Sequence, residues 1–175
     1  VGMALGQLVY GPLADRFGRR TVLLWALAGY VVANILCAVS SSFTLLLVAR
    51  VFGGSMIAAS RVATVALVRD CYHGRAMARV MSIAFMVFMI VPVLAPTFGQ
   101  TVLLFADWRG IFWTIAGVTA AVFIWFYVRM PETLRPDHVL PISIGRVARG
   151  WRIALTDRLS IGYTLAAAML MGALY

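Results

Sequence analysis

The sequence has no lysine and few acidic residues: 15 arginines face only six acids in 175 residues. Charged residues make up 12% of the chain, about half of what a soluble domain carries. Of the two cysteines, Cys37 lies in an apolar segment and Cys71 beside basic residues, so neither a disulfide framework nor metal-ligand spacing is present. These shortages argue against a soluble enzyme, a nucleic-acid-binding domain and a disordered chain.

The sequence also shows no catalytic constellation. His73 and His138 lie between apolar blocks, and neither has a partner at triad or metal-ligand spacing. We therefore expect no enzymatic activity, no metal and no cofactor.

Long apolar runs account for most of the chain, in which 63% of residues are hydrophobic. Six blocks are visible, at residues 1–13, 21–39, 43–68, 80–106, 110–128 and 159–175. A helix of about 20 apolar residues crosses a hydrocarbon layer about 30 Å thick. The middle four blocks therefore predict complete spans, and the outer two predict spans cut short. Continuous apolarity favours helices over the alternating strands of a barrel. The predicted fold class is an all-α polytopic membrane protein, of which this sequence is expected to be a piece.

Arginines are unevenly distributed among the segments that join these blocks. Twelve lie on one predicted side, in residues 14–20, 69–79 and 129–158. The other side has Arg109 alone, and Arg50 and Arg61 remain inside a span. Because cytoplasmic loops carry the excess of basic residues, these three segments are predicted to be cytoplasmic. This topology explains the formal charge of +9 better than a nucleic-acid partner does.

The longest connection, residues 131–158, separates a predicted bundle at 1–130 from the start of a second at 159–175. Apolar side chains recur in it at helical spacing, namely Ile144, Val147, Ala148, Trp151 and Leu155. The arginines lie off that stripe, which predicts an amphipathic helix in the lipid headgroup layer, attracted by anionic lipid. The alternative is a linker that only joins two bundles.

The most specific motif joins the first two blocks, where residues 11–20 read G-P-L-A-D-R-F-G-R-R. We expect Gly11 to allow close helix contact and Gly18 to allow a tight turn. Asp15 can accept hydrogen bonds from arginines or from a helix N-terminus in another bundle, which would form a latch. A basic turn that serves orientation alone would explain the arginines but not the Gly-Asp-Gly spacing.

This segment resembles the signature loop of the major facilitator superfamily, G-x-x-x-D-R-x-G-R-R. Every specified position matches, at Gly11, Asp15, Arg16, Gly18, Arg19 and Arg20. In that family the loop joins helices 2 and 3 of twelve. The resemblance therefore implies a partial major facilitator fold: helices 2–6 of the N-terminal bundle, a cytoplasmic loop and the start of helix 7.

Two arginines lie within the third block, where a charge is costly unless it faces a cavity or a partner. Arg50 and Gly54 resemble the family motif R-x-x-Q-G, with Gly53 in place of glutamine. The resemblance implies a substrate or coupling role for Arg50. Arg61 lies about three helical turns further on the same face, which predicts a cavity lined by both arginines. For both, the alternative is snorkelling toward the interface.

The fourth block contains two prolines four residues apart, Pro92 and Pro96, which remove two backbone donors and bend a helix. With Ala95 and Gly99 they resemble P-x-x-A-P-x-x-G, the helix-5 antiporter motif of the bicyclomycin/chloramphenicol-resistance (Bcr/CflA) subfamily. Gln100 replaces a second glycine of that motif. The alternative is a kinked packing helix.

Shorter segments resemble the same subfamily in order and spacing. They are Arg69 and Asp70 at the end of helix 4, and residues 107–112, 131–134 and 162–166. The resemblance implies proton-coupled efflux of small amphiphilic drugs by alternating access. It further implies a monomer in a bacterial inner membrane, driven by the proton gradient, with small-molecule substrate, protons and lipid as its partners.

No acidic residue lies inside any apolar block, and arginine does not release its proton. The proton-carrying acid is therefore expected outside this sequence, in helix 1. Two other functions stay open: an efflux carrier for sugars, nucleosides or amino acids on the same scaffold, and a non-transporting membrane relative.

Overall fold

The computed structural model describes residues 2–130, 145, 156–157, 161–166 and 168–169. It contains α1 (Gly2–Phe17), α2 (Arg19–Val39), α3 (Phe43–Cys71), α4 (Gly74–Leu103) and α5 (Trp108–Arg129), and residues 161–166 are also helical. No strand occurs among these residues. The chain divides into one unit at Val1–Val139 and another at Leu140–Tyr175, so the division falls inside the predicted connection.

Four helices are long and apolar enough to cross a bilayer: α2, the Phe43–Arg69 part of α3, α4 and α5. They coincide with the four blocks that predict complete spans, and the all-α, multi-span fold is confirmed. The predicted amphipathic helix falls on residues 144–155, nearly all of which lie outside the described part of the chain.

The predicted connections at the basic end of the bundle, where α1 meets α2 and α3 meets α4, are too long. The prediction placed them at residues 14–20 and 69–79, but only Gly18 separates α1 from α2, and only Tyr72 and His73 separate α3 from α4. Arginine and alanine are good helix formers, and a long arginine can carry its charge from a helix to the membrane interface. At this end of the bundle the helices therefore extend beyond their apolar blocks by two to six residues.

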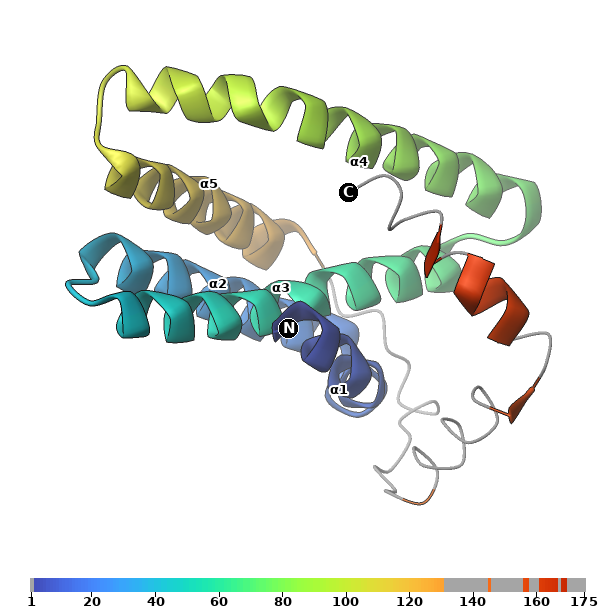
Figure 1. Ribbon diagram of the computed structural model, residues 1–175. Helices are drawn as coiled ribbons and strands as arrows, with labels where there is room; N and C mark the ends of the chain where they lie inside the picture. Colours follow the sequence, from blue (N-terminus) through green and yellow to red (C-terminus); the bar gives the residue numbers. More distant parts are fainter. Residues whose placement is uncertain (1, 131–144, 146–155, 158–160, 167, 170–175) are drawn as a thin grey trace. The chain divides into compact units, whose positions relative to one another are not determined.

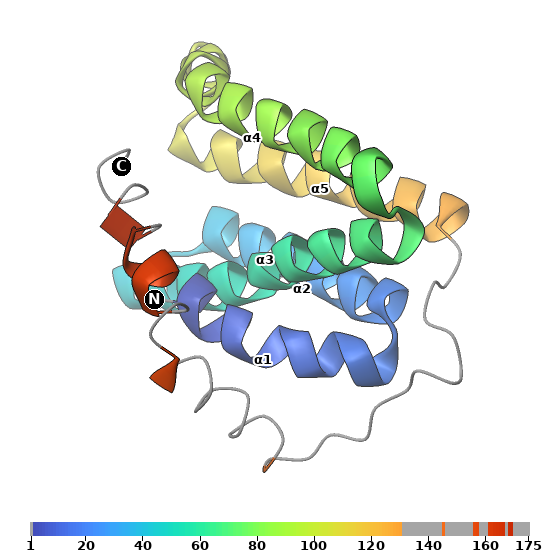
Figure 2. The same cartoon turned by 90° about the vertical axis from the view of Figure 1, so that its right-hand side faces the viewer.

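Helix α3 packs against α1 on one side and α2 on the other, and α2 packs against α5. Figures 1 and 2 both place α1 and α4 on opposite sides of these central helices. The buried residues are mostly small, as in the cluster of Ala14, Val22, Ala26 and Ala59. Small side chains let membrane helices approach closely, which strengthens van der Waals contact and compensates for the weak hydrophobic drive in lipid.

Glycines make the closest approach between α1 and α3. A Cβ placed on Gly6 would lie 2.6 Å from the carbonyl oxygen of Ser55, and one placed on Gly2 would collide with the carbonyl oxygen of Val51. No described atom lies within 4 Å of the corresponding point at Gly11. The close helix contact predicted for Gly11 is therefore made by Gly2 and Gly6, which lie more than one turn earlier in α1.

Candidate functional site

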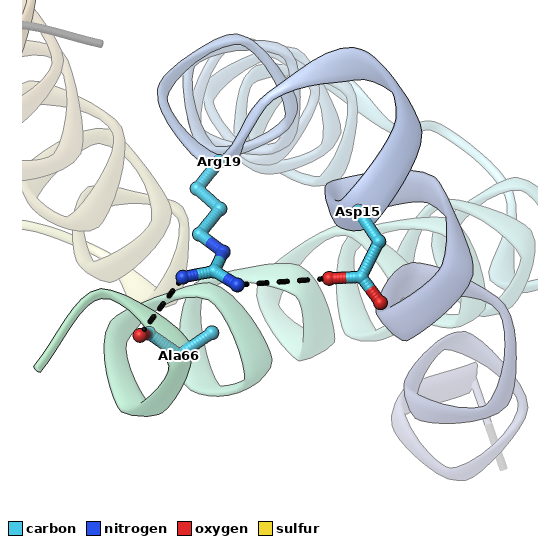
Figure 3. Close-up of polar contacts among 3 residues, drawn as sticks. All are labelled: Asp15, Arg19 and Ala66. Carbon is cyan, nitrogen blue, oxygen red and sulfur yellow. Dashed lines mark hydrogen bonds and ion pairs between the residues drawn. The ribbon is translucent and has the colours of Figure 1, made fainter. Parts of the chain in front are cut away.

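The signature loop is reduced to one residue in the left-handed region, because Gly18 has a φ of 91°. An L-residue with a side chain rarely adopts this conformation, whereas glycine does so readily. The turn brings Arg19, in the first turn of α2, beside the last turn of α1. The Arg19 guanidinium lies 3.7 Å from the Asp15 carboxylate and donates to the Ala66 carbonyl oxygen at 3.1 Å (Figure 3).

The ion pair leaves Asp15 accessible. The Asp15 side chain is 48% exposed, whereas that of Arg19 is 15% exposed. Arg19 is thus fixed between α1 and α3, and the carboxylate of Asp15 keeps room for a further donor. The latch to another bundle stays a prediction, since the pairing shown here lies within one bundle.

Two arginines connect α2 and α5 through backbone carbonyls, one at each end of the helix pair. Arg20 donates to the Tyr127 carbonyl oxygen at 2.8 Å, and its guanidinium lies 5.6 Å from the centre of the Tyr127 ring. At the opposite end, Arg109 donates to the Ser40 carbonyl oxygen at 2.8 Å. Each acceptor is in or next to the last turn of its helix, where carbonyls lack intrahelical partners and carry partial negative charge. We call these two contacts the arginine–carbonyl clamps.

The remaining arginine of the signature loop, Arg16, lies over the ring of its neighbour Phe17, 5.3 Å from the ring centre. It makes this contact within α1 and joins no other helix through it.

Arg50 lies near the end of the bundle opposite the signature loop. Its guanidinium lies 4.6 Å from the centre of the Phe112 ring on α5. Phe112 is buried in a cluster with Cys37, Ala38 and Ala49. Arg50 therefore has a partner within the bundle, the condition under which a charge is tolerated inside a span.

Arg61 lies further along α3, toward the basic end. Its guanidinium lies 4.8 Å from the centre of the Phe88 ring on α4. It also lines a cavity of about 850 Å³ between α1 and α3, with Gln7, Gly11, Ala14, Asp15, Arg19, Val62, Val65, Ala66 and Arg69. We call this the cationic cavity, because three arginines and one aspartate line it. Arg50 is not among its lining residues, so this cavity is not the predicted one that both Arg50 and Arg61 would line.

Four more of the predicted site residues have separate surroundings. Pro92, Pro96 and Gly99 lie within α4, which continues through both prolines without a break, and no residue of that helix is buried. Gly54 packs instead against α1, where its added Cβ would lie 3.3 Å from the Met3 backbone nitrogen. The structure thus brings Gly11, Asp15, Arg19, Arg61 and Arg69 around one cavity and leaves the helix-5 motif apart from it. The side chain of Asp70 lies outside the described part.

Sequence reasoning missed the aromatic partners of the two span arginines, Phe112 and Phe88, and the polar cavity residue Gln7. Gln7 and Gly11 are four residues apart, so they lie on one face of α1, and that spacing could have indicated a polar face. Nothing in the sequence marks Phe88 among the many phenylalanines. Among the described residues, no group of three metal-ligating side chains is close enough to hold a metal ion.

Four helices long and apolar enough to cross a bilayer, with arginines inside and between them, are the features of a multi-pass membrane protein. The family profile of the Major Facilitator Superfamily matches residues 1–175, and the chain belongs to that family. Its relatives place it among transporters rather than enzymes.

Two relatives match almost the whole chain. It is 34% identical over 179 residues to a bicyclomycin resistance protein homolog of Haemophilus influenzae, covering 99% of this chain and 44% of that protein. It is 32% identical over 174 residues to an uncharacterized MFS-type transporter, YdgK, of Bacillus subtilis, covering 98% and 43%. The multidrug resistance protein MdtL of Escherichia coli is 33% identical over 132 residues, covering 75% and 34%.

A solved structure has the same fold. The crystal structure of the human organic anion transporter MFSD10 (TETRAN) matches with a TM-score of 0.70 at 22% identity, over 91% of this chain and 37% of that one. The chain spans less than half the length of these relatives. The family profile and the sequence relatives confirm the resemblance drawn from the signature loop. The subfamily motifs agree with the resistance proteins named above.

Proposed function

We propose that the protein exports small amphiphilic drugs in exchange for protons, by alternating access in a bacterial inner membrane. The observation that carries this proposal is the 34% identity to a bicyclomycin resistance protein homolog over 99% of the chain. The matched region includes the signature loop, Arg50 and the two prolines of α4. The positions of Asp15 and Arg50 in the structure support a mechanism in which each has a distinct role.

Alternating access requires two bundles to rock about a site near the middle of the bilayer. In the proposed cycle, Asp15 accepts a hydrogen bond from the second bundle when the transporter faces outward, and loses it when the transporter faces inward. Its exposed carboxylate can do so while Arg19 stays bound to Ala66. The one-residue connection at Gly18 transmits the movement, because it gives α1 and α2 little freedom to move apart.

Proton coupling needs a titratable acid near the middle of the bilayer, where the substrate site of such transporters lies. The acids of the five helices and their connections, Asp15, Asp70 and Asp107, lie at or near helix ends, and arginine keeps its proton. We therefore place the proton-carrying acid in helix 1, outside this sequence. Arg50 would act on that acid or on the substrate through its fixed charge. We further propose a monomer that needs no cofactor and binds no nucleic acid.

A second candidate is an efflux carrier for sugars, nucleosides or amino acids. The cationic cavity is compatible with such polar substrates, but the resistance-protein relatives favour drugs. Competition distinguishes the two candidates. If the second is correct, an unlabelled sugar, nucleoside or amino acid would block export of its own radiolabelled form, and drug accumulation would stay unchanged.

The test is the accumulation of chloramphenicol and of a fluorescent cationic dye in cells that express the full-length protein, with and without a protonophore. We expect lower accumulation than in empty cells, restored by the protonophore. Arg50→Ala should abolish this coupled efflux, and Arg50→Lys should keep part of it, because lysine retains the charge but not the planar guanidinium.

The matched control is Arg129→Ala, which removes an exposed arginine at the end of α5 and should leave efflux unchanged. Accumulation equal to that of empty cells, with the protein present in the membrane, would overturn the proposed function. Full activity of Arg50→Ala would remove Arg50 from the mechanism and leave it as a structural partner of Phe112.

A further inference from the structure

The cationic cavity carries more positive charge than its own acid can balance. Arg19, Arg61 and Arg69 line it together with a single carboxylate, that of Asp15. Asp15 already pairs with Arg19. Within the described part of the chain, neither Arg61 nor Arg69 has a hydrogen bond or an ion pair. Two guanidinium groups on one wall are thus left with their donors unused.

These two arginines line the same cavity. They are eight residues apart on α3, which places them about 80° apart around the helix and about 12 Å apart along its axis. The guanidinium of Arg61 lies 4.8 Å from the centre of the Phe88 ring, a contact that uses none of its N–H donors in a hydrogen bond. The planar donor fork of arginine matches the oxygens of a phosphate group and binds them in pairs.

The size and place of the cavity restrict the ligand further. A volume of about 850 Å³ is much larger than one oxyanion and lies in the range typical of organic ligands. Asp15, Arg19 and Arg69 line the cavity at the basic end of the bundle, which the arginine distribution places at the cytoplasmic surface of the membrane. Phosphates of anionic lipids and soluble organic phosphates are both present there.

We propose that the cationic cavity between α1 and α3 binds the phosphate group of an organic anion through Arg61 and Arg69. The phosphate belongs either to an anionic lipid headgroup or to a soluble phosphate ester. Arg19 adds positive charge at the end of the cavity, and Asp15 weakens binding by repulsion. The site is separate from Arg50 and does not depend on the proposed drug transport.

Binding is tested on the full-length protein purified in a neutral detergent, by thermal denaturation at constant ionic strength. The probes are dihexanoyl phosphatidylglycerol for the lipid source and glycerol 3-phosphate for the soluble source. Dihexanoyl phosphatidylcholine, which has the same chains and no net charge, is the control ligand. We expect one or both anionic probes to raise the Tm in a saturable manner, with little effect of the control.

The variant Arg61→Gln/Arg69→Gln should raise the apparent Kd by about tenfold or more, because it removes two charged donors from the phosphate. Arg129→Gln lowers the net charge outside the cavity and should change the Kd by less than about twofold. Asp15→Asn should lower the Kd severalfold, an effect that a purely structural role for these residues would not produce. If the double variant does not fold, Arg69→Gln replaces it, since Arg69 has no polar partner to lose in the described part of the chain.

A response to the lipid probe alone would assign the site to a headgroup, and a similar response to glycerol 3-phosphate would assign it to a soluble ester. The proposal is overturned if neither probe stabilises the wild-type protein, or if the double variant and Arg129→Gln weaken binding equally. Because no transport is measured, a protein that binds the probes but exports no drug would overturn the proposed function and leave this site intact.

Discussion

Helices α2 and α4 have the same mean hydropathy but very different surroundings. Eight residues of α2 are buried against its neighbours, whereas none of α4 is. α2 is held at both ends by the arginine–carbonyl clamps and contacts α1, α3 and α5, while α4 makes few contacts with α3 and α5. Within the described residues the difference therefore does not come from hydropathy: α2 packs through small residues and polar contacts, whereas α4 makes few contacts of either kind.

The helix that packs least carries the predicted antiporter motif, with Pro92, Pro96 and Gly99. Large side chains such as Met86, Phe88 and Met89 cover its surface and remain at least 47% exposed. One of its specific contacts with α3 is the ring of Phe88 under Arg61. Among the described residues α4 therefore makes few contacts with α3 and α5, whereas α2 packs closely against both α3 and α5.

The same glycine substitution in the two regions should have the most unequal effect. Gly6→Leu forces a side chain against the Ser55 backbone and should cost about 3 kcal/mol, the upper end of overpacking penalties. A Cβ placed on Gly99 of α4 would meet no described atom within 4 Å, and Gly99→Leu should cost less than about 0.5 kcal/mol. The measurement is the yield of monodisperse protein and its Tm. Equal losses would show that α4 is packed after all.

Truncating the aromatic partner of each span arginine sharpens the comparison. Phe112→Ala removes a buried ring beside Arg50 and should destabilise the protein by about 2 kcal/mol. This is less than the 3–5 kcal/mol of a soluble core, because the unfolded side chain meets lipid rather than water. Phe88→Ala, at the half-exposed ring on α4, should cost under about 1 kcal/mol. Thermal denaturation in detergent measures both, and a larger loss at Phe88 would reverse the ranking.

Removing the exposed carboxylate of the signature loop should have little effect on stability. Asp15 is about half exposed and lies 3.7 Å from Arg19, so Asp15→Ala should cost about 0–1 kcal/mol. Turnover should nevertheless fall, because the proposed latch loses its acceptor. Efflux rates normalised to the amount of protein in the membrane measure this. Asp107→Ala, at the opposite end of the bundle, is the control, and near-normal efflux by Asp15→Ala would exclude the latch.

The sequence was sufficient to predict the complete spans, because a continuous apolar run of about 20 residues matches the thickness of a bilayer and is longer than most buried core helices require. It misplaced the connections near Arg16 and Arg75, because a basic residue at the membrane interface belongs equally well to a helix end or to a loop. The positive φ expected at a turn glycine occurs at Gly18. Gly6 was not predicted as a packing residue, because nothing in an apolar run distinguishes a glycine that faces α3 from one that faces lipid.

The surroundings of the site residues could be predicted only in part. An arginine inside an apolar span requires a partner or a cavity, so Arg50 and Arg61 were identifiable from the sequence. Their partners, Phe112 and Phe88, lie on other helices, and which ring faces which arginine depends on how the helices are placed side by side. The cationic cavity was missed for the same reason, since Gln7, Asp15 and Arg69 meet only when α1 packs beside α3.

The acceptors of Arg19, Arg20 and Arg109 are all backbone carbonyls, at Ala66, Tyr127 and Ser40. A carbonyl is present whatever residue occupies the position, so the acceptor site is free to mutate during evolution while the contact persists. Each arginine would then be retained without a covarying partner. Methods that infer helix contacts from correlated substitutions would not detect these three contacts, although they connect α2 to α3 and to α5.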